Sequence, residues 1–478
     1  MKNLLRKEIF YPVLILSEIA FILIAIFFLS KIVFIKILFI ALSVIAVLLI
    51  SDSEESPSFK LSKIVSIIIF PVYGGVIYFI IRKKRPVRNT ALYRKRDKDI
   101  TASYLINMGF KAFSPEGSRY FPDGESLFEE MLDRINTAKD YIYIEFFIIA
   151  DGKALDRLIE ALKIKASEGV KVKIIIDHMG SLFVKPKNFI KEMMGCGIQC
   201  RQFNPINPLK LNRLNLRDHR KILVVDGEYA FTGGINIADE YMNYKLRFGI
   251  WKDTGAMVCS KAAKAFSVMF EDMWKAVEEN RHYEQRKERE AVILPDKSFC
   301  IPFFDSPFDD IKLSLSLYLS LIYNAGKSIY ITTPYLVCDD EVLNALKTAA
   351  ASGIDVKLIL PGVPDKKLIN IITKSCYPTL MESGVEIYEY SEGFIHSKTI
   401  VADEEKAVAG TINLDYRSMS ETFECGCYFV KCGAVEEIYK DFTLTLSECR
   451  RIIPEETGKI SFFVKVARGF LKLFAPLM

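Results

Sequence analysis

The chain has 478 residues, 50% of them hydrophobic, and a formal net charge of +5. This length exceeds that of a usual single domain, so we expect two or three domains. The modest charge, without a basic stripe interleaved with aromatic residues, argues against nucleic acid as a partner. The ten cysteines form no regular disulfide framework and no complete set of zinc ligands.

Apolar residues are concentrated near the N-terminus, where they predict membrane helices. Residues 11–30, 32–50 and 61–81 are each long enough to cross a bilayer, because about 20 helical residues span its hydrocarbon core. We therefore expect residues 1–84 to form a transmembrane anchor. Two spans, with part of 11–50 re-entrant or interfacial, remain an alternative to three. The first apolar run is too long for a cleaved signal peptide.

A basic run at 82–96 follows the apolar region and extends into an expected juxtamembrane linker at 85–110. Positive residues beside a span favour the cytoplasmic side. The run also suits contact with anionic lipid, at roughly 1 kcal/mol per basic residue near the surface. We expect a multi-pass protein of the cell membrane whose remaining chain lies on the cytoplasmic side.

From about residue 100 onward, helical and strand patterns alternate, which is typical of an α/β fold. A helix at 125–140, a buried strand at 141–149, a helix at 153–168 and a strand at 170–177 are expected in the first half. The first of these helices has one apolar face, made by Leu127, Phe128, Met131, Leu132 and Ile135. The second half repeats this order. We expect two lobes, at 111–275 and 301–457, separated by a charged connector at 276–300.

One constellation of residues occurs twice, once in each expected lobe. Each member of the second copy lies 177 positions after its counterpart (219 to 396, 236 to 413). The first copy is His219, Lys221, Asp226, Gly233 and Asn236, and the second is His396, Lys398, Asp403, Gly410 and Asn413. Two copies imply one site that is built twice.

These residue types suit the chemistry of a phosphodiester. Neutral imidazole can attack phosphorus, since its unperturbed pKa is about 6.5. One histidine can take the phosphoryl group while the other protonates the leaving alcohol and later deprotonates the acceptor. The lysines, which share a strand face with the histidines, and the asparagines would form an electrostatic cradle. The glycines would let the backbone approach the phosphate closely.

The duplicated pattern HxKxxxxD, followed by GGxN or GTxN, resembles that of the phospholipase D superfamily and, within it, the bacterial cardiolipin synthases. The likeness covers nearly the whole chain. It includes YFPDGESLF at 120–128, IEFFIIADG at 144–152, LRDHRK at 216–221, WKDT at 251–254, ITTPYLVCDD at 331–340, GTINLDYRS at 410–418 and FE at 423–424.

The resemblance implies two phospholipase D-like lobes, each a mixed β-sheet flanked by helices, packed around one shared site. It also implies phosphatidyl transfer. We expect no metal or cofactor, because the lysines already supply the positive charge. One phosphatidylglycerol would donate its phosphatidyl group to a histidine and release glycerol, and a second would accept the group to give cardiolipin. The expected partners are phosphatidylglycerol and anionic membrane lipid, and a homo-oligomer is left open.

Roles for the individual residues follow from the resemblance. His219 is our choice for the nucleophile and His396 for the acid and base, although the duplication makes the order reversible. Asp226 and Asp403 are grouped with the catalytic residues; they lie seven positions from the histidines, at the far end of the motif strand, and are equally suited to fixing the turn there.

The resemblance also suggests that an acid on an adjacent strand orients each imidazole. Asp253 in WKDT and Glu424 in FE are the candidates. The expected phosphate-binding residues are Lys221 and Lys398 together with Asn236, Asn413, Gly233, Gly410 and Thr411.

Other functions share the motifs and stay open at this point. They are a hydrolytic phospholipase D, a phosphatidyltransferase using another alcohol such as ethanolamine or serine, a membrane-tethered nucleic acid phosphodiesterase, and a scaffold without activity. The C-terminal segment 458–478 is expected to be an amphipathic helix. It could lie in the membrane interface or dock onto the lobes.

Overall fold

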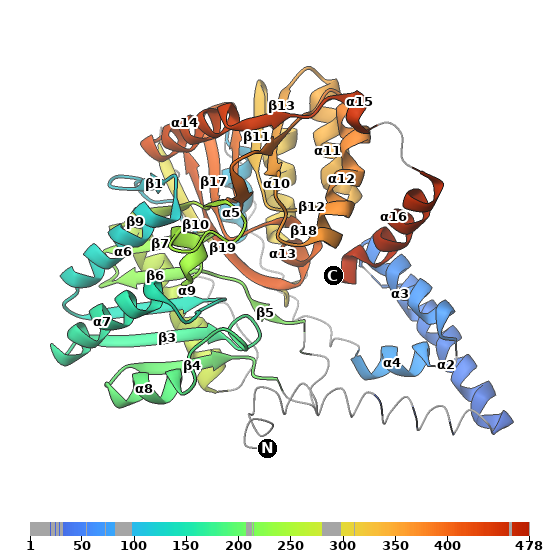
Figure 1. Ribbon diagram of the computed structural model, residues 1–478, viewed down its shortest axis with the longest axis horizontal. Helices are drawn as coiled ribbons and strands as arrows, with labels where there is room; N and C mark the ends of the chain where they lie inside the picture. The colour runs from blue at the N-terminus through green and yellow to red at the C-terminus, as the bar shows by residue number, and fades with distance from the viewer. Residues whose placement is uncertain are drawn as a thin grey trace. The chain divides into compact units, whose positions relative to one another are not determined.

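The computed structural model describes residues 32–53, 55–71, 73–81, 98–206, 213, 215–279, 298–309, 311–457 and 461–477, and the single residues 20, 24 and 28. The chain divides into two units. One, here called the anchor unit, contains Met1–Arg85, Asn204–Leu216 and Ser461–Met478, and the other, the two-lobed unit, contains Pro86–Phe203 and Arg217–Ile460. Figure 1 shows the elements of both.

Helix α2 (Val33–Ser51) is the one helix in the described ranges that is long and apolar enough to span a membrane. Its 19 residues correspond to about 28 Å of helix, close to the thickness of a hydrocarbon core. The helix matches the expected span at 32–50. The expected span at 11–30 lies almost entirely outside the described residues.

The expectation of one continuous helix at 61–81 is wrong. This region forms α3 (Pro57–Ile69) and α4 (Gly74–Ile81), which are separated at Phe70, whose φ of −123° and ψ of 66° are not helical. Pro71 explains the break, because proline lacks an N–H and disfavours the helical conformation of the residue before it. At about 20 and 12 Å, neither helix alone reaches across a core of about 30 Å.

Helix α4 packs back onto α2 through a small-residue contact. Gly75 donates its N–H to Ser43 Oγ at 3.1 Å, and the Ser43 hydroxyl donates to the Pro71 carbonyl at 2.6 Å. A Cβ at position 75 would lie 2.5 Å from Ser43 Cα, so only glycine fits at this crossing. Apolar packing of Ala46, Ile50 and Ile67 joins α2 to α3.

The first lobe is a mixed sheet in the order β1-β9-β7-β6-β2-β3-β4. Its strands β2, β3 and β4 are parallel and the others pair antiparallel. The strands are β1 (Arg119–Phe121), β2 (Tyr141–Phe146), β3 (Lys171–Asp177), β4 (Gln199–Phe203), β6 (Ile222–Val225), β7 (Tyr229–Gly233) and β9 (Gly255–Cys259), and the helices are α6 (Gly124–Thr137), α7 (Lys153–Ser167), α8 (Phe189–Gly195) and α9 (Ser260–Glu278).

The second lobe repeats this plan in the order β10-β19-β17-β16-β11-β13-β14, with β20 added at the edge. Strands β11, β13 and β14 are the parallel ones. The strands are β10 (Phe299–Asp305), β11 (Ser328–Thr332), β13 (Asp355–Pro361), β14 (Glu386–Tyr390), β16 (Thr399–Ala402), β17 (Lys406–Gly410), β19 (Thr422–Val430) and β20 (Cys449–Arg451), and the main helices are α10 (Leu313–Tyr323), α11 (Asp340–Ala351), α12 (Lys367–Met381) and α14 (Gly433–Ser447). The expected pair of mixed α/β lobes is confirmed.

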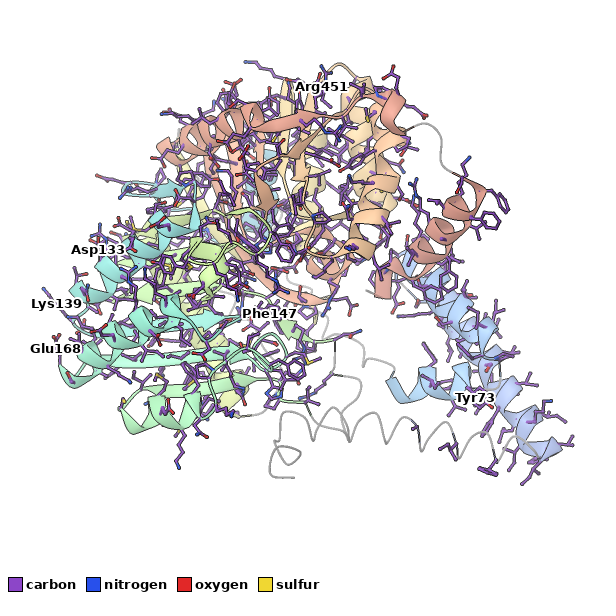
Figure 2. The ribbon with its side chains drawn as sticks, in the orientation of Figure 1. Tyr73, Asp133, Lys139, Phe147, Glu168 and Arg451 are labelled. Atoms are coloured by element: carbon purple, nitrogen blue, oxygen red, sulfur yellow. The ribbon has the colours of Figure 1, made fainter. Side chains whose placement is uncertain are left out.

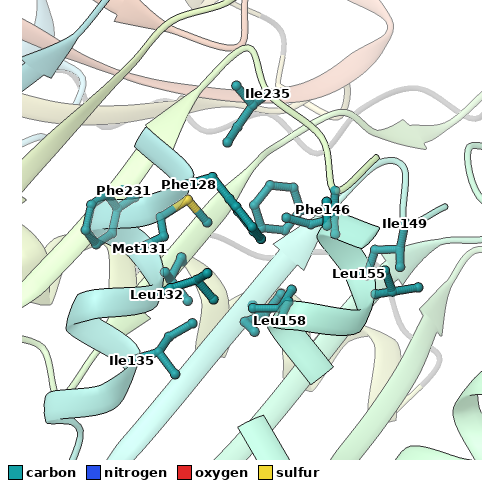
Figure 3. Packing of buried hydrophobic residues seen from close by; sticks show 14 of the residues in the cluster. Phe128, Met131, Leu132, Ile135, Phe146, Ile149, Leu155, Leu158, Phe231 and Ile235 are labelled. Atoms are coloured by element: carbon teal, nitrogen blue, oxygen red, sulfur yellow. The ribbon is translucent and has the colours of Figure 1, made fainter. Parts of the chain in front are cut away.

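The core of the first lobe forms where the apolar face of α6 meets the sheet. All five residues expected on that face are buried, and Figure 3 shows Phe128, Met131 and Leu132 directed toward Phe146 of β2. Asp123 caps this helix by accepting the Ser126 N–H at 2.7 Å, as is usual for an acidic N-cap.

The lobe boundaries differ from those expected. Residues 100–107, expected in the linker, form helix α5 (Ile100–Asn107), which packs on the second lobe, where Tyr428 donates its hydroxyl to Asp99 Oδ2 at 3.0 Å. Helix α9, which was not expected, extends to Glu278 within the connector. The rest of the connector, 280–297, lies outside the described residues.

Two short strands cross between the lobes. β5 (Arg217–Asp218), from the first lobe, runs parallel to β19 of the second. β15 (Gly393–Ile395), from the second lobe, runs parallel to β8 (Ile250–Lys252) of the first. Each lobe therefore lends a strand to the other, and each of these strands leads directly into a motif histidine.

Candidate active site

The exchanged strands fix the backbone of both histidines. His219 follows β5 and donates its N–H to the Phe423 carbonyl at 3.0 Å. His396 follows β15 and donates its N–H to the Lys252 carbonyl at 2.7 Å. Glu424 and Asp253 come directly after these acceptors, so the strand register places one acid beside each histidine.

The contacts between acids and histidines cross from lobe to lobe. His219 Nδ1 lies 2.9 Å from Glu424 Oε1 and 3.0 Å from Oε2, and His396 Nδ1 lies 2.6 Å from Asp253 Oδ2. The sequence suggested both acids but left their pairing open. A carboxylate at Nδ1 favours the tautomer whose Nε2 carries a lone pair, so both Nε2 atoms are available for chemistry.

The two acids have different surroundings. Glu424 accepts hydrogen bonds from the hydroxyls of Thr411 and, at 2.8 Å, Thr422. At the position equivalent to Thr411, the first lobe has Gly234, where a Cβ would lie 1.9 Å from Asp253 Oδ1. Thr411, expected to bind phosphate, thus directs its hydroxyl to the acid, and Gly234 makes room for the other acid.

Burial shifts the protonation equilibria of this group. It lowers the pKa of His219 and of His396 well below the usual 6.5, and the neighbouring lysines lower both further. Burial raises the pKa of Asp253 and of Glu424 to about 7, against the opposing effect of the lysines. At neutral pH both imidazoles are therefore uncharged, as a nucleophile requires.

The two motif lysines occupy equivalent buried positions. Lys221 Nζ donates to the His219 carbonyl at 2.6 Å, and Lys398 Nζ donates to the His396 carbonyl. Burial lowers the pKa of Lys221 to about 8 and of Lys398 to about 7, while the buried acids act in the opposite direction. Both ammonium groups influence both imidazoles, so the lysines of the two lobes share one site.

Aromatic rings surround the imidazoles. Phe147 packs edge-on against His219 with ring centroids 5.2 Å apart, and Figure 2 labels it on the side of the first lobe that faces the second. His396 contacts three rings, those of Tyr241, Trp251 and Phe394, at 5.5 to 5.8 Å. These rings limit the access of water.

The grouping of Asp226 and Asp403 with the histidines needs correction. The carboxylate of Asp226 accepts the N–H groups of Lys139, Asp140 and Tyr141 at 2.8 Å. That of Asp403 accepts the N–H groups of residues 326–328. Both lie at the end of the motif strand away from the histidine, since each directly follows the last residue of its strand, Val225 of β6 or Ala402 of β16. They fix turns, in left-handed conformations with φ of 53° and 55°.

Gly233 and Gly410 serve strand pairing. Each faces another glycine, Gly255 or Gly426, in the neighbouring strand. A Cβ at either position would lie 2.4 Å from the carbonyl oxygen of the residue before that facing glycine, Thr254 or Cys425. The space that was expected to admit phosphate is therefore taken by the next strand.

The two asparagines differ. Asn236 Oδ1 accepts the Ile148 N–H at 3.0 Å and its Nδ2 donates to the Tyr241 hydroxyl at 2.8 Å, so one N–H remains for a ligand. Asn413 Oδ1 is buried and has no hydrogen-bond partner within the described part of the chain. Their role in phosphate binding stays a prediction.

A family model described as cardiolipin synthase, PLD-like domain, matches residues 131–274 and 318–444. The chain belongs to this cardiolipin synthase family of phospholipase D-like proteins. The two matched segments lie within the two lobes.

Individual relatives agree with this assignment. The chain is 39% identical to an uncharacterized protein of Streptococcus mutans, over 79% of this chain and 82% of that one. It is 31% identical to cardiolipin synthase 2 of Bacillus anthracis, over 88% of this chain and 87% of that one. The crystal structure of phosphatidylserine synthase from Haemophilus influenzae has a similar fold, with a TM-score of 0.64 at 16% identity, over 79% of this chain and 97% of that one.

Sequence reasoning missed most of a group of buried charges beside His219, namely Asp177, Arg217, Asp218 and Arg220. Arg220 is fully buried; its guanidinium lies 2.6 Å from Glu145 Oε1 and 3.3 Å from Asp218 Oδ1. Arg217 lies 3.4 Å from the buried Asp177. A signal was present, since Glu145 stands in an otherwise apolar strand, YIYIEFFII, and a buried acid usually has a cationic partner.

Proposed function

We propose that the protein synthesises cardiolipin by transferring a phosphatidyl group between two phosphatidylglycerol molecules through a phosphohistidine intermediate. The observation that carries the proposal is the crossed pair of imidazoles, each with Nδ1 on a buried carboxylate of the other lobe. Two buried lysines lie in the same site. The family assignment supports a phosphatidyltransferase.

In the first step, Nε2 of His219 attacks phosphorus of the donor lipid. A P–N bond forms and the P–O bond to the headgroup glycerol breaks, while His396 gives a proton to the departing oxygen. In the second step, His396 takes the proton of a glycerol hydroxyl on the acceptor lipid. That oxygen attacks phosphorus, the P–N bond breaks, and cardiolipin leaves with His219 restored.

The protonation states fit this scheme once the charge of the substrate is included. The low pKa of His219, caused by burial and the two lysines, keeps the nucleophile neutral. His396 must carry a proton to act as an acid. A bound phosphodiester anion counters the lysines and raises the pKa of His396, and Asp253 stabilises the imidazolium.

The remaining site residues support these steps. Lys221 and Lys398 neutralise the phosphate oxygens, where charge increases in the transition state. Asn236 and Asn413 contribute amide contacts, and Asp253 and Glu424 orient the imidazoles. The acceptor alcohol must compete with water, and the rings around both histidines favour it by excluding water.

The same proposal includes the location of the enzyme. The family and helix α2 support membrane association. We extend this to a multi-pass protein whose lobes lie on the cytoplasmic side, because the basic run at 82–96 follows the apolar region. That run would also attract anionic lipid.

The test follows both products in reconstituted vesicles containing phosphatidylglycerol. We expect cardiolipin and free glycerol in equal amounts, and the loss of both in His219→Asn and His396→Asn. The matched control is His282→Asn, a histidine outside both motifs. Phosphatidic acid as the sole lipid product would identify a hydrolase, and the absence of any turnover would rule out catalysis.

A further inference from the structure

The C-terminal helix α16 (Phe462–Phe474) exposes large apolar side chains along one face. The exposed fractions are 73% for Phe462, 81% for Phe463, 55% for Val466 and 57% for Phe470. These positions lie within about a third of a turn of one another around a helical axis. Such a contiguous apolar surface usually marks a contact with a partner or a membrane.

The cations of this helix lie away from that face. Lys465, Arg468 and Lys472 fall on one side of the helix, roughly opposite the exposed phenylalanines at about 100° per residue. An apolar face combined with lysine and arginine on the other side is the pattern of helices that lie along a bilayer surface. The cations also match the charge of anionic lipid.

The contacts of α16 inside the anchor unit place it near one end of the candidate span. Its last turn packs on α3, where Ser62 donates its hydroxyl to the Leu473 carbonyl at 2.5 Å. Two residues earlier, Lys60 Nζ donates to the carbonyl of Ser51, the last residue of α2. Figure 1 shows α16 beside α3.

The polar groups at this level indicate where the hydrocarbon core ends. Lys63 pairs with Glu55 at 2.5 Å, and such charges are costly inside a bilayer core. The contact between α16 and α3 is therefore at the boundary between hydrocarbon and headgroups. This depth is where an amphipathic helix lies.

We infer that α16 lies in the headgroup region of a bilayer containing anionic phospholipid, with Phe462, Phe463, Val466 and Phe470 inserted toward the acyl chains. The surface of α2 continues this apolar contact, since Phe34 and Leu48 are also largely exposed. The inference concerns membrane contact and does not depend on the transfer reaction.

The test introduces a tryptophan at position 463 in the full-length protein and measures its quenching by phosphatidylcholine brominated in the acyl chains. The vesicles also contain phosphatidylglycerol, and all variants carry His219→Asn so that turnover cannot change the lipid composition. The native Trp251 and Trp274 are buried and give the same background in every sample. Lys465→Trp, on the opposite side of the helix, is the matched control.

We expect strong quenching of the tryptophan in Phe463→Trp and little in Lys465→Trp. Replacing phosphatidylglycerol by phosphatidylcholine should weaken the quenching, because the attraction of the cations is lost. Equal quenching at the two positions, or none at 463, overturns the inference. A blue-shifted but unquenched tryptophan at 463 would also overturn it, and would indicate that a protein surface covers the helix.

Discussion

The two histidines of the site are presented by very different surroundings. His219 stands between charged residues, with Arg217 and Asp218 before it and Arg220 after it, and the buried Arg220 contacts Glu145 at 2.6 Å. His396 stands between Phe394–Ile395 and Ser397, and three aromatic rings contact its imidazole. The His219 side chain is 15% exposed and that of His396 is 9% exposed.

This difference teaches that the duplication conserved the reacting groups but not their support. Buried ion pairs require partners with defined geometry, whereas rings tolerate small shifts and exclude water. The two histidines therefore need not share the nucleophilic role equally. His219 is the more exposed histidine, and the carboxylate that contacts it accepts hydrogen bonds from at least two hydroxyl groups. It is therefore the better candidate for the group that must reach the substrate phosphorus.

The largest expected effect separates the roles of the two histidines. A phosphatidyl ester of p-nitrophenol has a leaving group that needs no proton. We expect His396→Asn to release one equivalent of nitrophenol in a burst, while His219→Asn releases none, because only the nucleophile is required for this step. Stopped-flow absorbance measures the burst. A burst from His219→Asn alone would reverse the two roles.

The next effect concerns the acids that contact the histidines. Glu424→Gln and Asp253→Asn preserve shape but remove the charge that selects the tautomer. We expect each to lower kcat for cardiolipin formation by about 10²- to 10⁴-fold, as in other acid–histidine pairs. Asp133→Asn, on the surface of α6, is the control and should leave the rate unchanged. Rates near that of the control would mean that the carboxylates do not orient the imidazoles.

The buried charges beside His219 should matter most for stability. Arg220→Met leaves Glu145 buried without its cation, which we expect to lower the free energy of unfolding by about 3–5 kcal/mol. Adding Glu145→Gln to this variant should recover part of the loss. Chemical denaturation in detergent measures both.

The equivalent position in the second lobe provides the matched control. Ser397→Ala removes the hydrogen bond between Ser397 Oγ and Thr254 Oγ1, which are 2.6 Å apart. This should lower the free energy of unfolding by about 1 kcal/mol. Similar losses of unfolding free energy in Arg220→Met and Ser397→Ala would contradict the proposed difference between the surroundings of the two histidines.

The smallest expected effect is a shift in pH dependence. Burial lowers the pKa of Lys398 to about 7 and of Lys221 to about 8, so these lysines lose their charge as the pH rises through this range. We expect kcat/KM, which reports the free enzyme, to fall above neutral pH. Lys398→Arg should move this decline to higher pH, and the surface variant Lys327→Arg should not.

The chemistry of the site could be read from the sequence because it constrains residue type and spacing. The paired histidines and lysines suit what a phosphodiester needs, and the α/β lobes follow from regular apolar periodicity. The acids Asp253 and Glu424 were suggested by the family resemblance. The pairing of Glu424 with His219 could not be predicted from the sequence. The two residues are 205 positions apart, and the exchange of strands between the lobes brings them together. The sequence left Asp226 and Asp403 with two roles, a catalytic one and fixing the turn, and their backbone partners decide for the turn.

The membrane region shows a different limit. The apolar content of 61–81 was sufficient for a span, but Pro71 ends α3 and Gly74 begins α4. A hydropathy average over 61–81 does not detect this break, because proline interrupts the helix without making the segment less apolar. Helix α5 was missed for a related reason, since eight residues next to a basic run give too short a pattern for periodicity to reveal.

The exchange of β5 and β15 between the lobes has an evolutionary consequence. A substitution at Asp253 acts on His396, and one at Glu424 acts on His219. A mutation in either half of the gene therefore impairs the histidine encoded by the other half. Unlike a tandem duplication whose copies act separately, neither repeat is free to drift toward a new role. Selection is therefore expected to act on both halves as one inherited unit.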